Sequence, residues 1–112
     1  MFLCDFCACH PPSWTYPCTD FESPEMSFSV SKGNWAACND CYQLIEARDT
    51  HALIQRSATA FLSRTAEVLP QEHLPSLEHI CEYLEKLYTE FERHRTGDPH
   101  PFDQEHTASH AP

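Results

Sequence analysis

The sequence predicts a small α+β protein, with short strands in its first half and an antiparallel pair of helices in its second half. Residues 1–50 are rich in cysteine and aromatic side chains, and apolar residues recur every three or four positions between 50 and 95. A chain of 112 residues can form one small core, which proteins of this size often reinforce with a metal or a partner. We expect a compact module at 1–50, a helical hairpin at 51–95 and a disordered polar tail at 96–112.

Four of the seven cysteines form two Cys-x-x-Cys pairs, Cys4 with Cys7 and Cys38 with Cys41. Such a pair places two thiolates on one tight turn, and a structural zinc site needs four ligands of this kind. The odd cysteine count and the lack of an N-terminal export signal favour a reducing, cytoplasmic setting, and hence a metal over disulfides. A redox role would require a single pair on a βα unit. We predict that these four cysteines bind one structural Zn²⁺.

Two segments between the cysteine pairs are expected to form strands. Trp14 to Tyr16 carries aromatic side chains on one face, and residues 26–31 alternate between apolar and polar. Residues 32–34, with a central glycine, indicate a turn. The 30 residues between the pairs therefore have room for a β-hairpin that brings the ligands together. The side chains expected around the metal are Trp14, Tyr16, Phe28, Trp35, Tyr42, Leu44 and Ile45.

A short helix is predicted to begin within the second cysteine pair and to end near Arg48, because Tyr42, Leu44 and Ile45 are spaced to share one side. Free N–H groups and the positive end of the helix dipole would stabilise thiolates in its first turn. A knuckle, a hairpin and ligands at a helix start together define the treble-clef zinc finger. This is the fold that we expect for 1–50.

The same residues resemble a motif of short uncharacterised bacterial and phage proteins, over about residues 3–57. The matching segments are Cys4-Asp5-Phe6-Cys7, Trp14 to Pro17, Asp20-Phe21 and Trp35 to Glu46. The resemblance implies a zinc-binding treble clef and says little about activity. The chain departs from a standard knuckle at Ala8, where glycine is common.

Two longer helices are predicted in the second half. The first spans about 50–68 and is capped by Asp49 or Thr50, and the second spans about 75–95, with Pro75 in its first turn. The second helix carries an apolar stripe of about two heptads, too short to indicate a coiled coil. Its apolar residues pack against the first helix or form a dimer seam; those of the possible seam are Leu77, Ile80, Leu84, Leu87 and Phe91.

Further candidate ligands are less well matched to a metal. Cys9, His10 and Cys18 offer three donors where a structural site needs four, so local packing and a surface turn are the simpler interpretation. His10 could also tune a zinc-bound sulfur. Cys81 lies on the apolar side of the last helix, where buried free cysteine is common.

The charge distribution argues against direct binding of nucleic acid. The formal net charge is −10, and no segment carries the basic patch that phosphate contacts require. Residues 11–50 contain no histidine for a nuclease of the His-Asn-His type, and only two glycines leave no phosphate-binding loop. No apolar run approaches the length of a membrane span. We therefore expect neither an enzyme nor a membrane protein.

The sequence leaves three functions open. The first is a zinc-stabilised protein–protein interaction module acting as a small regulator or adaptor. The second is an acidic inhibitor of a nucleic-acid-binding protein, such as a phage-type antagonist of host transcription or defence, which would occupy a basic cleft. The third is a self-associating structural protein, a homodimer formed through the 75–95 helix.

Overall fold

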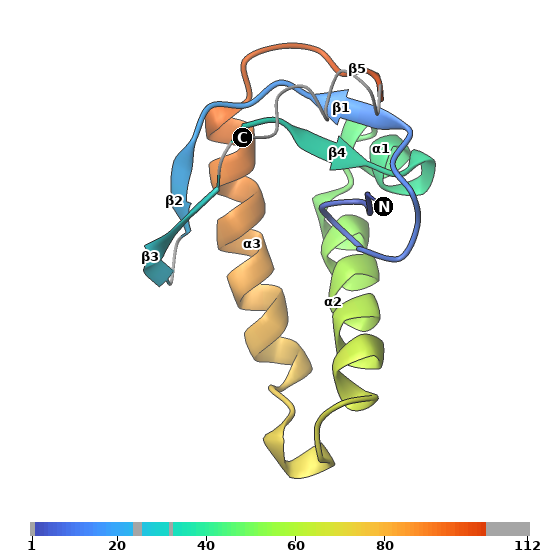
Figure 1. Ribbon diagram of the computed structural model, residues 1–112, viewed down its shortest axis with the longest axis vertical. Helices are drawn as coiled ribbons and strands as arrows, with labels where there is room; N and C mark the ends of the chain where they lie inside the picture. The colour runs from blue at the N-terminus through green and yellow to red at the C-terminus, as the bar shows by residue number, and fades with distance from the viewer. Residues whose placement is uncertain (1, 24–25, 32, 103–112) are drawn as a thin grey trace.

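A computed structural model describes residues 2–23, 26–31 and 33–102, with the backbone alone for 26–30 (Figure 1). Its described elements form a three-stranded sheet in the order β4-β1-β5, a two-stranded sheet of β2 and β3, and three α-helices. The prediction of a small α+β protein is therefore confirmed. The elements are β1 (Trp14–Tyr16), β2 (Phe21–Ser23), β3 (Met26–Ser31), β4 (Trp35–Ala37), α1 (Asn39–Glu46), α2 (Thr50–Ala66), the 3₁₀ turn η1 (Gln71–His73), α3 (Leu77–His94) and β5 (His100–Pro101).

The strands differ from the expected hairpin in their pairing. The two predicted strands form with the expected bounds, but β1 pairs antiparallel with β4, with Trp14 opposite Ala37, and β3 pairs with β2. The sequence pattern predicted no strand at the positions of β2 and β4. Three-residue strands give too short a pattern to recognise, and here pairing across the fold stabilises them. As a consequence, the second cysteine pair, which follows β4 directly, lies beside the first pair.

The three helices begin and end close to the predicted bounds. Asp49 caps α2, because its carboxylate accepts a hydrogen bond of 3.1 Å from the Ala52 N–H. Ser76 caps α3 in the same way, so this helix begins after Ser76 and not at Pro75. Figure 1 shows α2 and α3 running side by side in opposite directions, joined through η1 at one end of the molecule.

One core joins the cysteine-rich half to the helical half. The Phe91 ring of α3 lies 5.1 Å from that of Trp35, 5.2 Å from Phe6 and 5.6 Å from Tyr16, measured between centroids. Ile80 and Phe91, two of the five residues of the possible dimer seam, are buried within the chain, whereas Leu77 is exposed. The helices thus pack directly on the module expected to hold the metal.

The region expected to be a polar tail begins as part of the sheet. In β5, His100 pairs with Thr15, and the Phe102 N–H donates to the Ser13 carbonyl over 2.9 Å. The Phe102 ring also meets Phe2 at 5.6 Å. Pro101 is tolerated because β5 is an edge strand, where one N–H is not needed for pairing. The remaining residues of the predicted tail, 103–112, lie outside the described residues.

Within the described ranges, none of the helices has the length and apolar character needed to cross a bilayer.

Candidate metal centre

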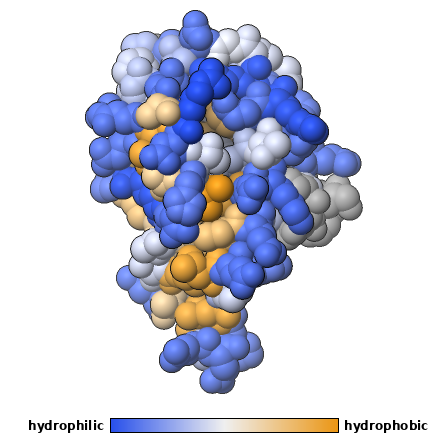
Figure 2. Space-filling view, turned by 180° about the vertical axis from the view of Figure 1, so that it is seen from behind, coloured by the Kyte–Doolittle hydropathy of each residue, from blue (hydrophilic) through white to orange (hydrophobic). Residues whose placement is uncertain are grey.

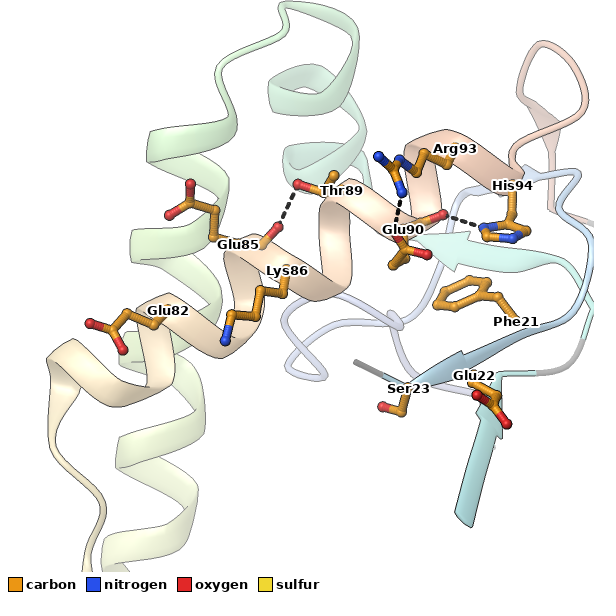
Figure 3. A pocket seen from close by; sticks show the side chains of 10 residues that line it. All are labelled: Phe21, Glu22, Ser23, Glu82, Glu85, Lys86, Thr89, Glu90, Arg93 and His94. Carbon is orange, nitrogen blue, oxygen red and sulfur yellow. Dashed lines mark hydrogen bonds and ion pairs between the residues drawn. The ribbon is translucent and has the colours of Figure 1, made fainter. Parts of the chain in front are cut away.

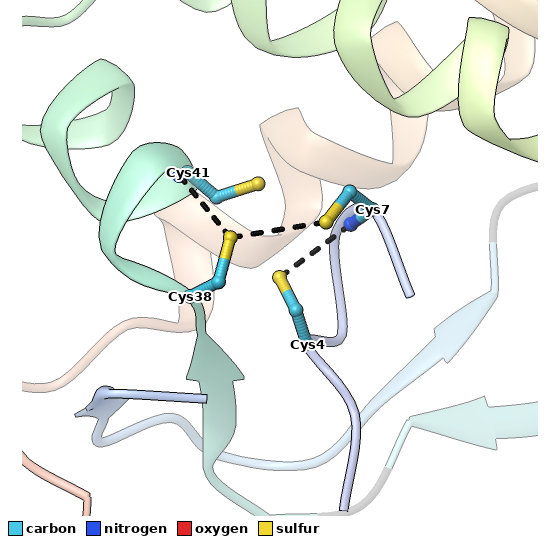
Figure 4. A group of neighbouring side chains, drawn as sticks. All are labelled: Cys4, Cys7, Cys38 and Cys41. Atoms are coloured by element: carbon cyan, nitrogen blue, oxygen red, sulfur yellow. Dashed lines mark hydrogen bonds between the residues drawn. The ribbon is translucent and has the colours of Figure 1, made fainter. Parts of the chain in front are cut away.

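The four paired cysteines meet at the junction of the N-terminal loop and the start of α1 (Figure 4). Cys4 and Cys7 lie on the loop, Cys38 is the N-cap residue of α1, and Cys41 lies in its first turn. Their Sγ atoms all lie within 4.8 Å of one another, and each residue is at most 3% exposed. This is the group of side chains that sequence spacing predicted, brought together in space.

The geometry of the sulfurs suits a tetrahedral metal ion. Zinc–thiolate bonds of about 2.3 Å place neighbouring sulfurs about 3.8 Å apart. The Sγ atoms of Cys7 and Cys38 lie 3.8 Å apart. Four thiols with no oxygen donor form the ligand set of a structural zinc site. The residues present therefore fit the expected ion.

Backbone N–H groups point at the sulfurs of both pairs. The N–H groups of Phe6 and Cys7 donate to Cys4 Sγ over 3.4 and 3.5 Å, and the Cys41 N–H donates to Cys38 Sγ over 3.5 Å. Such bonds favour the charged thiolate over the thiol. The first turn closes at Ala8, whose φ of 55° lies in the left-handed region that glycine adopts more easily. The departure noted at Ala8 thus falls on a strained position.

The thiols differ in how readily they ionise. A hydrogen bond with Cys41 lowers the pKa of Cys4 to about 4, and the same interaction, together with burial, raises the pKa of Cys41. Burial also raises the pKa of Cys38. Without a cation, Cys4 therefore ionises easily, whereas Cys38 and Cys41 resist ionisation. A metal ion has to displace protons from Cys38 and Cys41 when it binds.

Arg56 of α2 is a cationic side chain in contact with a sulfur of this cluster. Its Nη2 lies 3.9 Å from Cys38 Sγ and 3.5 Å from a carboxylate oxygen of Asp40. Interaction with Cys41 is the main reason that the pKa of Arg56 is raised, so the guanidinium stays charged. A Zn²⁺ ion held by four thiolates would carry two net negative charges, and Arg56 would offset part of this charge.

Other contacts fix the loop that carries the first pair. Asp5 and Ala36 exchange two hydrogen bonds, from the Asp5 N–H to the Ala36 carbonyl over 2.8 Å and from the Ala36 N–H to the Asp5 carboxylate over 2.7 Å. Arg64 of α2 donates to the Cys7 carbonyl over 2.6 Å, and the Tyr88 hydroxyl of α3 donates to the Phe6 carbonyl over 3.3 Å. Strands and helices therefore hold the loop in place together.

The other candidate ligands do not join a metal-binding group within the described residues. Cys9 and His10 are exposed, and Cys18 is buried with its thiol directed to the Phe91 carbonyl at 3.9 Å. Burial raises the pKa of Cys18, which keeps it a thiol. Cys81 is partly buried against the core.

The expected aromatic surroundings form in part. Trp14 stacks on Tyr42 with centroids 4.1 Å apart, and Trp35 packs on Phe6 at 5.1 Å. The side chain of Phe28 lies outside the described residues. Sequence reasoning missed Phe6, Tyr88, Arg56 and Arg64 at this site. The position of Phe6 between two ligands could have indicated the first of these, whereas the other three depend on how the helices dock.

Comparison with known proteins leaves the chain to be understood from its own geometry. No family model, curated protein or solved structure matches it. The resemblance to small bacterial and phage proteins thus stays a prediction, and the site itself defines a small α+β protein with a four-cysteine cluster suited to a metal.

Proposed function

We propose that this protein is a zinc-stabilised protein–protein interaction module that acts as a small regulator or adaptor. The observation that carries the proposal is the near-complete burial of all four clustered thiols, each at most 3% exposed. A zinc ion with four buried thiolates has no open position for a substrate, so its role is structural. The surface around it is then left to recognise other molecules.

The fold proposed for the metal module is the treble clef. The N-terminal loop supplies the first pair of ligands, strand β4 leads into the second pair, and α1 begins at that pair. The split of the expected hairpin over two small sheets is a local variation on that plan. We further propose that the protein works in the cytoplasm, where reducing conditions keep its thiols available for zinc.

A second candidate function is the acidic inhibitor of a nucleic-acid-binding protein. Besides the net charge of −10, a groove of about 770 Å³ between β2 and α3 supports it (Figure 3). This acidic groove contains four glutamates and two cations, and Arg93 pairs with Glu90 at 3.3 Å. Its four glutamates are Glu22, Glu82, Glu85 and Glu90.

The test combines metal analysis with partner capture. Elemental analysis of the purified protein should give one zinc per chain, and a pull-down from cell extract, read by mass spectrometry, should yield a stoichiometric partner. A partner retained at high salt supports an adaptor that docks through apolar surface, and a basic partner released as salt rises supports the inhibitor. Protein without zinc, or a catalytic activity abolished by one non-cysteine substitution, would overturn the proposal.

A further inference from the structure

Several large apolar side chains are exposed at the helical end of the molecule, on α2, on α3 and in the segment that joins them. Figure 2 shows apolar surface along the lower part of the molecule, where α2 and α3 extend beyond the sheets. Phe61, Leu69 and Leu77 are 39%, 43% and 44% exposed, and Val68 is 77% exposed. Exposed apolar surface that gathers in one region marks a site of interaction more often than scattered single residues do.

A cavity of about 540 Å³ opens in this region between α2, α3 and the metal-binding loop. We call it the apolar pocket. Its volume falls in the range of about 300–1,000 Å³ that is usual for binding sites. Its larger apolar and aromatic lining residues are Phe6, Phe61, Pro75, Ile80, Tyr83 and Leu84. Asp5, Arg64 and His79 also line it, so its polar groups are of both charges.

Tyr83 separates the apolar pocket from the acidic groove. Its ring lines the pocket, and its hydroxyl lies 2.9 Å from the Ser23 hydroxyl, which belongs to the groove. The next residue toward the N-terminus, Glu82, faces the groove. An apolar site and a negatively charged site therefore lie on either side of one tyrosine.

We infer that the apolar pocket and the acidic groove together bind one segment of a partner protein, which carries large apolar side chains next to lysine or arginine. This inference rests on the proposed interaction function and specifies its partner. The apolar side chains enter the pocket beside Phe61 and Leu84, and the basic side chains reach Glu82 and Glu85. Charge complementarity of this kind selects the partner, while the buried apolar contact supplies most of the affinity.

Two other possible occupants of the pocket and groove are acidic, as the groove itself is. A second copy of this chain has the same net charge of −10 and would bring a second acidic groove to the contact. The chain's own residues 103–112 contain Asp103 and Glu105 and neither lysine nor arginine. Like charges facing each other oppose association, so the occupant is a different and basic chain.

The experiment uses the full zinc-loaded protein and three fluorescent 16-residue peptides of helical pattern, measured by anisotropy at about 50 and 150 mM salt. The first peptide is built from leucine and lysine, the second replaces lysine with glutamate, and the third replaces leucine with serine. We expect the leucine–lysine peptide to bind at least tenfold more tightly than either of the others. Equal binding of the serine–lysine peptide would overturn the inference, because charge alone would then account for it.

Variants of the protein locate the binding site. Phe61→Glu, at an exposed position in the pocket, should weaken the leucine–lysine peptide at least tenfold at both salt concentrations. Glu82→Lys combined with Glu85→Lys should weaken it mainly at low salt. Ser63→Glu places the same charge at an exposed position of α2 outside the pocket; it is the matched control and should change affinity less than twofold. Equal losses in the Phe61→Glu and Ser63→Glu variants would contradict the assignment.

The same variants separate this inference from the broader proposal. If extract yields a partner that binds Phe61→Glu as well as the natural protein, the interaction function stands and the apolar pocket is not its site. If no partner is captured although the peptide binds as expected, the proposed adaptor role fails while the pocket keeps its assigned chemistry.

Discussion

Apolar side chains are buried to different extents at the two ends of this molecule: the metal end around the four clustered cysteines, and the helical end where α2 and α3 are joined through η1. At the metal end, four thiols and the rings of Phe6, Trp35 and Phe91 are buried together, and hydrogen bonds from two helices hold the loop. At the helical end, Val68 and Leu77 remain exposed. A chain this short cannot bury apolar surface everywhere. Metal ligation would concentrate stability at one end, and the proposed binding surface lies at the other.

The largest expected effect comes from removing the metal ligands. Replacing Cys38 and Cys41 together with serine should abolish cooperative folding of the metal end, because structural zinc contributes about 10–16 kcal/mol in small zinc modules. That is as large as the whole stability of most small domains, about 5–15 kcal/mol. Near-ultraviolet circular dichroism of the buried tryptophan would report the loss. The exposed Cys9, changed to serine, is the control and should leave the spectrum intact.

We expect bound metal to be released as the pH falls, because protons compete with the metal for the thiolates. Metal binding needs thiolates, and the raised pKa values of Cys38 and Cys41 mean that at least two protons leave when the ion enters near neutral pH. Apparent affinity should therefore fall about 100-fold for each unit that the pH falls, between about pH 8 and 6. Competition with a coloured chelator at several pH values measures this slope. A slope of one proton or none would show that the thiols are already ionised without the metal.

A pair of truncations compares the two ends directly. Phe91→Ala should cost about 3–5 kcal/mol, because it removes a fully buried ring from the aromatic core. Leu77→Ala at the helical end should cost less than about 1 kcal/mol, because that side chain already contacts solvent. Urea denaturation of the zinc-loaded variants gives both values. Similar losses at the two positions would mean that stability is evenly spread and that the contrast between the ends is wrong.

Arg56 offers a smaller effect, confined to the metal end. Arg56→Gln should speed zinc transfer to a chelator about 10–100-fold, since neighbours of metal ligands typically contribute that much. Arg56→Lys keeps the charge and should recover most of the loss. Asp40→Asn removes the carboxylate that competes for the guanidinium and should slow release. If glutamine and lysine at position 56 behave alike, charge is not what Arg56 supplies.

A feature of the fold or of the metal site could be predicted from the sequence when the residues that determine it lie close together along the chain. The ligand pairs and the cap of α2 rest on residues one to three positions apart, so their spacing alone reveals them. The cap of α3 at Ser76 was not predicted. The pairing of β1 with β4 joins segments about twenty residues apart, and Phe91 reaches the metal core from fifty residues beyond Cys41. Arg56 meets Cys38 only because α2 packs beside α1. Such contacts depend on tertiary packing, which periodicity does not specify.

The smallest expected effect is that of replacing alanine with glycine, once in the metal-binding loop and once in α2. Ala8 has a φ of 55°, and the left-handed conformation costs a residue with a Cβ about 1–2 kcal/mol. Glycine avoids that cost but loses about 0.5–1 kcal/mol through the greater freedom of the unfolded chain. Ala8→Gly should therefore raise stability by up to about 1.5 kcal/mol. Ala66→Gly, in the last turn of α2, relieves no strain and only increases the freedom of the unfolded chain. It should therefore lower stability by about 0.5–1 kcal/mol.

Thermal denaturation of the two zinc-loaded variants gives the signs. Opposite shifts in Tm would show that the strain lies in the metal-binding turn. Two downward shifts of equal size would mean that the loop relaxes around Ala8 in solution. In that case the turn carries no strain, and Ala8 serves the knuckle as well as glycine does.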